Sequence, residues 1–416
     1  MRIVKLTPRT EKWLLARRAQ RDDEAHSVAA TIVADVRKRG DSALFAWSKK
    51  LDELDLARDG VWIPGKEIRA AKAQVSSEFL KAIQRAAKNV RRVAEKQLPR
   101  LWTVETEPGV KISQRVSPIE SIGCYIPGGR FSLVSTLLMT AVPAKVAGVS
   151  CIITVCPRPN PELLATANLL GIDKIARVGG AQAIGALAYG TKSIPRVEKI
   201  FGPGNKYVTA AKQIVSSDCA IDLPAGPTEA IVLAAEGNAR WIAADLLAQA
   251  EHAKDAASFF VTTSRSLAHE VQREIKWQLA ELPPGIASVS TETAGAILLA
   301  DSLEQACEFV NRFAPEHLSV PENTGSLLKG IHSAGTVFLG PWGAQPLGDY
   351  ATGSNHVLPT GGWACKRGGL STADFVKCFS VQTISRNGFL RLAGTVETLA
   401  ESEGLMAHRN AVRVRQ

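Results

Sequence analysis

Two side chains in the second half of the chain have the spacing to act together. Gln249 and His252 are three residues apart in the run 239–253, whose Ala and Leu content predicts a helix. Residues three apart share one face of a helix. An amide oxygen and an imidazole nitrogen that converge from one face can bind a metal ion. A single histidine on a helix is more often a packing residue, so the metal interpretation depends on other stretches.

Three later stretches supply further ionisable groups beside Gly or Pro turns, where polar side chains commonly carry function. These groups are Glu316 and His317 after Pro315, Asp349 after Gly348 with His356 beyond it, and Glu403 with His408 near the C-terminus. They strengthen the interpretation of Gln249 and His252 as part of a site.

The composition is that of a globular protein. The chain has 416 residues, 45% of them hydrophobic and 22% charged, which is enough for two or more domains with sizeable cores. No apolar run reaches the roughly 18 residues that a membrane span needs, and the first residues lack the apolar core of a signal peptide. The seven cysteines are scattered without a CxxC motif, so we expect reduced thiols and a cytoplasmic protein.

The basic charge leaves an alternative open. The net charge is +10 and the isoelectric point is near 9.3, as in many nucleic-acid binders. However, the Lys and Arg residues are spread along the chain, and aromatic residues, at 6%, do not interleave with them. We therefore expect a solvated basic surface that helps to collect anionic cofactors. A salt-dependent shift of DNA would support the other interpretation.

The elements that must position these residues change along the chain. Apolar residues at helical spacing predict helices over 22–40, 42–50 and 76–98, and alternation predicts strands between 102 and 125. Beyond 125, short apolar strands alternate with helices up to about residue 339, among them helices over 161–170 and 180–189 and a strand over 199–201. This rhythm predicts parallel sheets covered on both faces.

Three Gly-rich turns follow strands of this first α/β unit: Pro127–Gly129, Val178–Gln182 and Phe201–Asn205. Free backbone N–H groups at a helix start accept pyrophosphate, and such turns line the ligand crevice of an open parallel sheet. A GxGxxG fingerprint is absent, and Gly also occurs in such turns for steric reasons. From the turns alone, cofactor binding stays open.

Seven stretches stand together in the order of one known family. They are Val178-Gly-Gly-Ala-Gln-Ala-Ile184, Lys199-Ile-Phe-Gly-Pro-Gly-Asn205, Asp222-Leu-Pro-Ala-Gly-Pro-Thr-Glu229, Gln249-Ala-Glu-His252, Pro315-Glu-His317, Gly348-Asp-Tyr-Ala-Thr-Gly-Ser-Asn-His-Val-Leu-Pro-Thr360 and Glu403 to His408. The chain resembles the histidinol dehydrogenases from the N-terminal arm to the C-terminal tail. Each motif is short, but the ordered set is specific.

The resemblance implies a role for each matching position. The metal ligands would be Gln249, His252, Asp349 and, from a partner subunit, His408, and the acid–base pair would be Glu316 and His317. The substrate would contact Thr228, His356, Glu403 and Ser135, together with His317 and the metal ligands. NAD would contact Tyr125, Gln182 and Asn205. Thr228 departs from the family, in which many members carry Ser, but the hydroxyl is kept.

The implied reaction oxidises L-histidinol to L-histidine through bound L-histidinal and reduces two NAD, with one zinc ion per subunit. A histidine suits a base that works near neutral pH, and a carboxylate beside it suits activation of water in the second step. Zinc with mixed N and O ligands would hold the substrate as a template.

The implied fold is α/β: two tandem incomplete Rossmann-like domains with parallel sheets, a helical N-terminal arm, a helical C-terminal tail and an intertwined homodimer. We expect an arm at 1–25, a metal-binding and catalytic domain at 26–105 and 229–370, an NAD-binding domain at 120–228, and a tail at 371–416 that completes the partner's active site.

Two further alternatives remain. One is a zinc-stabilised binding protein without catalysis, which would need a closed metal site. The other is a related zinc- and NAD-dependent dehydrogenase that acts on another small polar alcohol. We expect no membrane or nucleic-acid partner.

Overall fold

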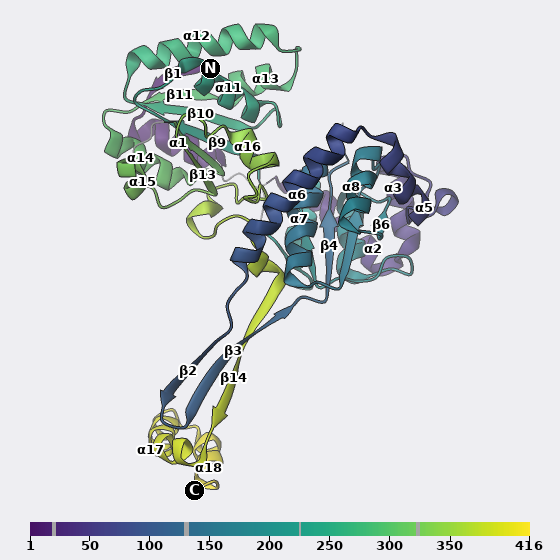
Figure 1. Cartoon of the computed structure of the whole chain (residues 1–416), viewed down its shortest axis with the longest axis vertical. Helices are drawn as coiled ribbons and strands as arrows, with labels where there is room; N and C mark the ends of the chain where they lie inside the picture. Colours follow the sequence, from purple (N-terminus) through teal and green to yellow (C-terminus); the bar gives the residue numbers. More distant parts are fainter. Residues whose placement is uncertain (19–21, 129–132, 224–225, 322–324) are drawn as a thin grey trace.

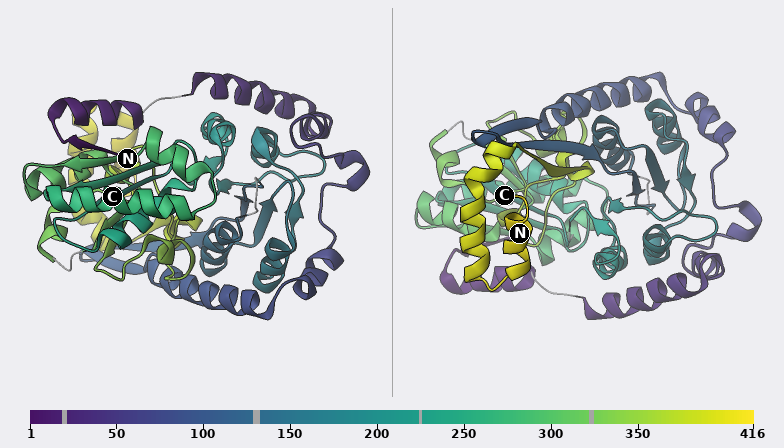
Figure 2. Two further views of the ribbon diagram at one scale, coloured as in Figure 1. Left: turned by 90° about the horizontal axis from the view of Figure 1, so that it is seen from above. Right: turned by 90° about the horizontal axis from the view of Figure 1, so that it is seen from below.

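The computed structural model describes residues 1–18, 22–128, 133–223, 226–321 and 325–416. Two α/β lobes lie side by side, and a narrow arm leads from them to the C-terminal helices (Figures 1 and 2). Each lobe contains one parallel sheet, as the alternation of strands and helices predicted. Gly129 of the first Gly-rich turn lies outside the described residues.

The first lobe is built on a six-stranded parallel sheet with the order β1-β11-β10-β9-β12-β13. Its strands are β1 (Arg2–Lys5), β9 (Glu229–Leu233), β10 (Ala257–Thr262), β11 (Ala296–Leu299), β12 (His317–Val320) and β13 (Thr336–Leu339). Alternate residues of β9 enter different cores: Ile231 packs on the side of α14, and Val232 on the side of α11 and α12. The inner strands are apolar on both faces because helices cover both faces.

The helices described in this lobe are α1 (Pro8–Arg18), α11 (Ala239–Ala250), α12 (Arg265–Glu281), α13 (Ile286–Thr293), α14 (Leu303–Phe313), α15 (Gly325–Gly330) and α16 (Gln345–Tyr350). Residues 1–25 were expected to form a helical arm, and α1 is helical, but the first residues correct this expectation. Arg2–Lys5 is a strand that pairs in parallel with β11. Only the open edge of β11 in the folded sheet provides its partner, so the short segment carried little local signal.

The second lobe is built on a five-stranded parallel sheet with the order β6-β5-β4-β7-β8. Its strands are β4 (Ser121–Tyr125), β5 (Cys151–Val155), β6 (Ile175–Ala176), β7 (Lys199–Phe201) and β8 (Ala220–Ile221). Its helices include α7 (Val134–Ala147), α8 (Pro161–Leu170), α9 (Gly180–Tyr189) and α10 (Lys206–Val215). The bounds of α8, α9 and β7 are those that the sequence predicted.

The N-terminal helices after α1 also pack on this second lobe. They are α2 (Asp23–Arg39), α3 (Asp41–Asp52), α4 (Leu56–Asp59), α5 (Gly65–Ala70), η1 (Ala71–Gln74) and α6 (Ser77–Gln97). Ile32, Val33 and Val36 of α2 share a core with α9 and α10, and Ile83 and Val90 of α6 share one with α7. Residues 26–105 were expected with 229–370, and this contact pattern corrects that expectation. Helical spacing identifies a buried face but not the sheet that covers it.

The arm is a three-stranded antiparallel sheet of β2 (Trp102–Glu107), β3 (Val110–Pro118) and β14 (Val376–Ile384), in the order β14-β3-β2. Short 3-10 helices, η2 (Trp363–Cys365) and η3 (Thr372–Phe375), precede β14, and α17 (Arg386–Ser402) and α18 (Met406–Arg413) follow it. The tail 371–416 is therefore not only helical, because β14 pairs with β3 over nine residues from Val376↔Pro118 to Ile384↔Val110. Its pairing partner lies more than two hundred residues earlier in the chain.

The seven cysteines all lie among the described residues, and none of them is in a disulfide there. Within the described ranges, no helix has both the length and the apolar character that crossing a membrane requires.

Candidate active site

The predicted acid–base pair lies at the edge of the six-stranded sheet where its strands begin. β9 and β12 are parallel neighbours, with His317 opposite Ala230. Thr228 and Glu316 immediately precede these strands, so the register brings them together. Helix α11 returns from the far end of β9, and its last turn carries Gln249 to the same edge. The strand–helix alternation thus assembles residues far apart in sequence.

A chain of hydrogen bonds fixes Glu316. The Thr228 hydroxyl donates to Glu316 Oε2, and the Glu229 backbone N–H donates to the same oxygen at 2.9 Å. Gln249 Nε2 donates to Thr228 Oγ1 at 2.6 Å, and Gln345 Nε2 donates to Gln249 Oε1. A predicted metal ligand is therefore connected to the predicted acid–base pair through the hydroxyl at position 228, which explains why Thr can replace Ser there.

His317 is 4% exposed and lies between two carboxylates. Its Nδ1 is 3.7 Å from Glu316 Oε2, and its Nε2 is 3.4 Å from Asp349 Oδ1. Burial opposes the charged ring, but the charges of Glu316 and Asp349 outweigh burial and raise the pKa of His317 above its ordinary value. Among the described residues, neither ring nitrogen has a hydrogen-bond partner of good geometry. Buried imidazole nitrogens are normally paired, so both are available to a ligand.

Asp349 lies on α16 and is buried with three imidazoles around it. Burial alone would raise the pKa of Asp349, but its interaction with His317 and the nearby charges of His356 and His252 lower it, so it is a carboxylate at neutral pH. His356 Nδ1 is 3.0 Å from the Asp349 carbonyl oxygen, and burial lowers the pKa of His356. The neutral His356 ring and the Asp349 carboxylate are therefore potential ligands.

The donors in one chain fit a zinc ion but are incomplete. His252 is exposed, and its Nδ1 is 3.0 Å from the Ala248 carbonyl, which leaves Nε2 free to coordinate, as is usual for metal-binding histidines. With Gln249 and Asp349 it supplies amide, imidazole and carboxylate donors, a mixed N/O set suited to zinc. Within the described part of the chain, no three His, Cys, Asp or Glu side chains are grouped closely enough to hold a metal by themselves.

The predicted fourth ligand is not at this site within one chain. Glu403, which directly follows α17, and His408, in α18, are exposed at the far end of the arm from both lobes (Figure 1). Large apolar side chains of the arm and tail are exposed as well: Phe379 of β14 is 53% exposed, Leu399 of α17 58% and Val414 after α18 69%. Apolar side chains gathered on a small projecting unit are typical of a surface that another chain covers.

The predicted NAD contacts lie in the other sheet, at the carboxyl edge, where the strands of the five-stranded sheet end. Tyr125 is the last residue of β4, and its hydroxyl accepts the Gly180 N–H at 3.2 Å. Gln182 is fully buried in α9 and donates to Asp52 at 2.8 Å, while its Oε1 has no partner among the described residues. Asn205 caps α10 by accepting the N–H groups of Tyr207 and Val208. The carboxyl edge of an open parallel sheet is the usual dinucleotide site.

Ser135 is half-buried in the first turn of α7. The Asn355 side chain donates to the Met139 carbonyl of the same helix at 2.7 Å. This bond fastens the segment that carries His356 against α7. Ser135 thus belongs to the helix that connects the two candidate regions, although no contact joins it directly to the acid–base pair.

Sequence reasoning overlooked Glu229, which begins β9. Its carboxyl group is buried; Oε1 accepts the Gly361 N–H at 3.2 Å, and Oε2 has no hydrogen-bond partner among the described residues. Burial, reinforced by the charge of Glu316 and opposed by Arg18, raises the pKa of Glu229 to about 8. A carboxylate at the head of an otherwise apolar strand, Glu229–Leu233, was a signal that could have found it.

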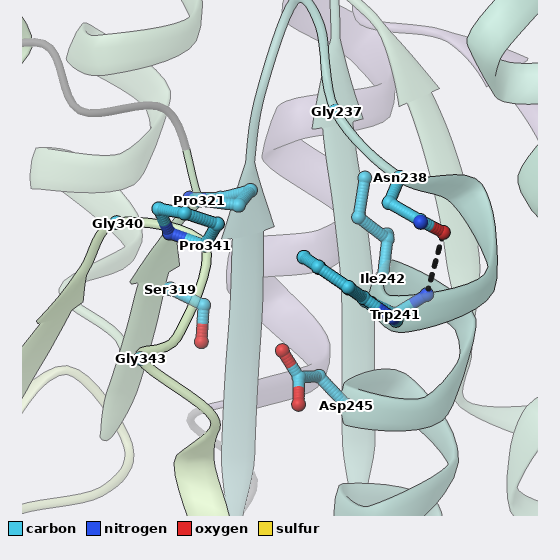
Figure 3. Close-up of a pocket in the computed structure, with 10 residues that line it drawn as sticks. All are labelled: Gly237, Asn238, Trp241, Ile242, Asp245, Ser319, Pro321, Gly340, Pro341 and Gly343. Atoms are coloured by element: carbon cyan, nitrogen blue, oxygen red, sulfur yellow. Dashed lines mark hydrogen bonds between the residues drawn. The ribbon is translucent and has the colours of Figure 1, made fainter.

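At the carboxyl edge of the six-stranded sheet, the described residues line a small cavity. The residues that line it include Trp241, Asp245 and Pro341, and the Trp241 ring enters it (Figure 3). Its volume is about 60 Å³, room for one or two waters and well below that of a ligand pocket. The two sheets therefore offer their candidate residues at different edges.

The fold and the site together define an α/β protein with a buried Glu–His pair beside a carboxylate. The histidinol dehydrogenase family model matches residues 15–416. A histidinol dehydrogenase from Methanosarcina barkeri is 44% identical over 97% of this chain and 94% of its own, and one from Aquifex aeolicus is 43% identical over the full length of both. The crystal structure of the enzyme from Elizabethkingia anophelis superposes with a TM-score of 0.94 at 39% identity, over 100% of this chain and 98% of that one.

The chain belongs to the histidinol dehydrogenase family. It is therefore an oxidoreductase, as its sequence motifs indicated.

Proposed function

We propose that the protein oxidises L-histidinol to L-histidine through bound L-histidinal, in the last steps of histidine biosynthesis in the cytoplasm. The overall change consumes one alcohol, one water and two NAD, and yields one carboxylate, two NADH and three protons. The observation that carries this proposal is the buried Glu316–His317 pair beside Asp349, in which neither ring nitrogen of His317 has a hydrogen bond of good geometry among the described residues. Family membership over nearly the whole chain supports the substrate.

In the first oxidation, His317 accepts the proton of the substrate hydroxyl group. The carbon that bears this hydroxyl gives a hydride to NAD. The raised pKa of His317 makes its neutral ring a stronger proton acceptor than a free imidazole. Glu316 stays oriented because its Oε2 accepts two hydrogen bonds, from the Thr228 hydroxyl and the Glu229 N–H. The pair is therefore placed before the substrate arrives.

The second oxidation begins with the addition of water to the aldehyde carbon. Glu316 takes a proton from that water and protonated His317 gives its proton to the aldehyde oxygen, so the hydrated aldehyde forms and His317 is again a base. His317 then accepts the hydroxyl proton of the hydrate as the second hydride leaves for NAD. The same two side chains can serve both steps because they are in contact, with His317 Nδ1 3.7 Å from Glu316 Oε2.

Zinc would be held by Gln249, His252 and Asp349 of one chain and His408 of its partner. When bound, it would hold the amine and imidazole nitrogens of the substrate and so keep the aldehyde in place between the steps. Thr228, His356, Glu403 and Ser135 would complete the substrate contacts, together with His317 and the metal ligands. NAD would lie over Tyr125, Gln182 and Asn205.

The quaternary and domain arrangement forms part of the same proposal. Glu403 and His408 lie on an exposed apolar tail away from their own lobes, which supports an intertwined dimer in which each tail completes the partner's site. The order β11-β10-β9-β12-β13 has the same pattern as β6-β5-β4-β7-β8, which supports two tandem incomplete Rossmann-like domains. An ancient duplication would account for this shared order.

A substrate panel tests the function. The purified protein is given L-histidinol, L-histidinal and other small polar alcohols with NAD, and NADH absorbance is followed. We expect two NADH for each L-histidinol, one for each L-histidinal, and slow turnover of alcohols that lack the imidazole. Preference for another alcohol would move the chain to a related dehydrogenase activity, and zinc binding without NAD reduction would make it a binding protein.

A further inference from the structure

A buried ion pair lies beneath the Phe201–Asn205 turn of the second lobe. Lys212 on α10 and Asp222 after β8 are joined through Lys212 Nζ and Asp222 Oδ1, with side chains only 4% and 1% exposed. Removing two charges from water costs several kcal/mol for each, so replacing such a pair by apolar side chains is often neutral or stabilising. Stability alone therefore does not explain the pair.

Both ions bind the same turn residue. Lys212 Nζ donates to the Gly202 carbonyl at 2.9 Å, and Asp222 Oδ2 accepts the Gly202 N–H at 2.8 Å. The two polar groups of Gly202 are thus held from opposite sides. Asp222 Oδ1 also accepts the Leu223 N–H at 2.7 Å, so its carboxylate is fully engaged.

The turn needs this restraint because its backbone is unusual. Gly202 has φ +109, a region that favours glycine, and a side chain there would collide with the Tyr125 carbonyl. The turn therefore packs directly on the end of β4. At its other end, Asn205 caps α10. Gly202, which the ion pair holds, therefore lies next to both proposed NAD contacts of this turn. It packs on the Tyr125 backbone, and Asn205 follows it by three residues.

We propose that Lys212 and Asp222 are positioning residues that hold the Phe201–Asn205 turn in the shape that binds NAD. The inference rests on the proposed NAD site and adds to it the part that makes the site rigid. A turn held before binding loses less conformational freedom when the cofactor arrives, so the pair acts on NAD affinity more than on the chemical step. The Asp222 carbonyl also accepts from Arg367, which holds the pair to the segment between η2 and η3.

Three variants separate positioning from stability. Asp222→Asn and Lys212→Met each leave one ion buried without its partner, and we expect both to lower the melting temperature and to raise the Kd for NAD about tenfold. The double variant Lys212→Met/Asp222→Asn removes both charges. We expect it to recover most of the melting temperature but not the NAD affinity, because the bond to the Gly202 carbonyl stays lost.

Lys145→Met is the matched control. Lys145 Nζ also donates to a glycine carbonyl, that of Gly171 at 3.0 Å, in the same lobe. Gly171 precedes β6, whereas Gly202 follows β7, so the two turns lie at opposite edges of the parallel sheet. Lys145→Met should therefore leave the Kd for NAD unchanged. For all variants kcat at saturating NAD should stay within about twofold of the wild type.

Recovery of NAD affinity together with stability in the double variant would overturn the inference. If none of the variants folds, hydrogen exchange of the Gly202 amide is measured in the NAD-free wild-type protein. Slow exchange supports the positioning role of Lys212 and Asp222, and rapid exchange that slows only after NAD is added overturns it. If the wild-type protein does not bind NAD, the proposed cofactor is wrong. That result differs from the outcomes above, in which the wild-type protein binds NAD.

Discussion

The two parallel sheets of this protein have the same strand pattern but present their candidate residues at opposite edges. In the five-stranded sheet the proposed NAD contacts follow the strands, at the carboxyl edge. In the six-stranded sheet Glu316 precedes β12 and His317 begins it, at the amino edge, and a cavity of about 60 Å³ lies at the carboxyl edge. One fold pattern can thus serve binding at one edge and proton transfer at the other.

The edges differ in what the backbone supplies. Strands that run into glycine turns and helix starts leave N–H groups free for an anionic cofactor. At the amino edge of the six-stranded sheet, the end of α11 and the short helix α16 bring side chains instead, including Gln249 and Asp349. A reaction that needs a base and a metal therefore suits the amino edge, and a dinucleotide suits the carboxyl edge.

Removing metal is the strongest test of the amino edge. We expect about one zinc per subunit and complete loss of turnover after treatment with a strong chelator, with recovery when zinc is returned, because Gln249, His252 and Asp349 form a mixed N/O donor set. Metal analysis beside activity measures this. NAD affinity at the other edge should be nearly unchanged, and full turnover by the metal-free protein would contradict the zinc site.

Replacing His317, the proposed base, should cause the next largest loss of turnover. His317→Asn should lower kcat about a thousandfold for both L-histidinol and L-histidinal, since both oxidations transfer a proton to the same ring. Steady-state rates with each substrate measure this.

Glu316→Gln is the matched variant. It should oxidise alcohol slowly but fail with added aldehyde, because an amide does not take a proton from water. Normal turnover of L-histidinal by Glu316→Gln would remove the role given to Glu316.

A mixing experiment tests whether the tail serves the partner's amino edge. Inactive His317→Ala and inactive His408→Ala proteins are mixed and allowed to exchange subunits. Random exchange makes about half the dimers mixed, and each mixed dimer has one intact site of two, so about a quarter of wild-type activity should return. If each tail served its own lobe, every site would keep one lesion. No recovery after exchange confirmed by mass tagging would exclude the shared site.

The carboxyl edge should respond through affinity. Tyr125→Phe removes the hydroxyl that accepts the Gly180 N–H, and we expect the KM for NAD to rise several-fold, up to about tenfold, with kcat little changed. The contrast with His317→Asn, which should change kcat, sharpens the division between the edges. A fall in kcat with an unchanged KM for NAD would place Tyr125 in the chemistry.

The smallest effect on turnover is expected for Glu229→Gln. The pKa of Glu229 is raised to about 8, so the wild-type group is mostly protonated at pH 7 and an amide resembles it. A carboxyl with a raised folded-state pKa stabilises the fold at low pH, and this contribution falls as pH rises from 4.5 to about 8. The shift corresponds to at most roughly 5 kcal/mol.

Chemical denaturation at several pH values measures this difference. Stability of Glu229→Gln should vary less over that range than stability of the wild type, and should exceed it above about pH 8. Equal pH dependence in the two proteins would show that Glu229 is not buried as described.

Local sequence determined the strands and helices of the parallel sheets. The bounds of α8, α9 and β7 followed from apolar runs, glycines and caps, because these signals act within a few residues. Motifs such as Pro315-Glu316-His317 identified the family and named the candidate residues. What they could not show is that Thr228 connects Gln249 to Glu316, because that contact depends on the register of β9 and β12.

Only the tertiary structure decided the partners of each element. Helices α2 to α6 pack on the five-stranded sheet, β1 completes the six-stranded sheet, and β14 pairs with β3. The ion pair Lys212–Asp222 and the buried Glu229 likewise escaped the sequence, since a charge is expected at the surface until its burial is seen. Periodicity shows that a face is buried, and the chain must fold before that face has a neighbour.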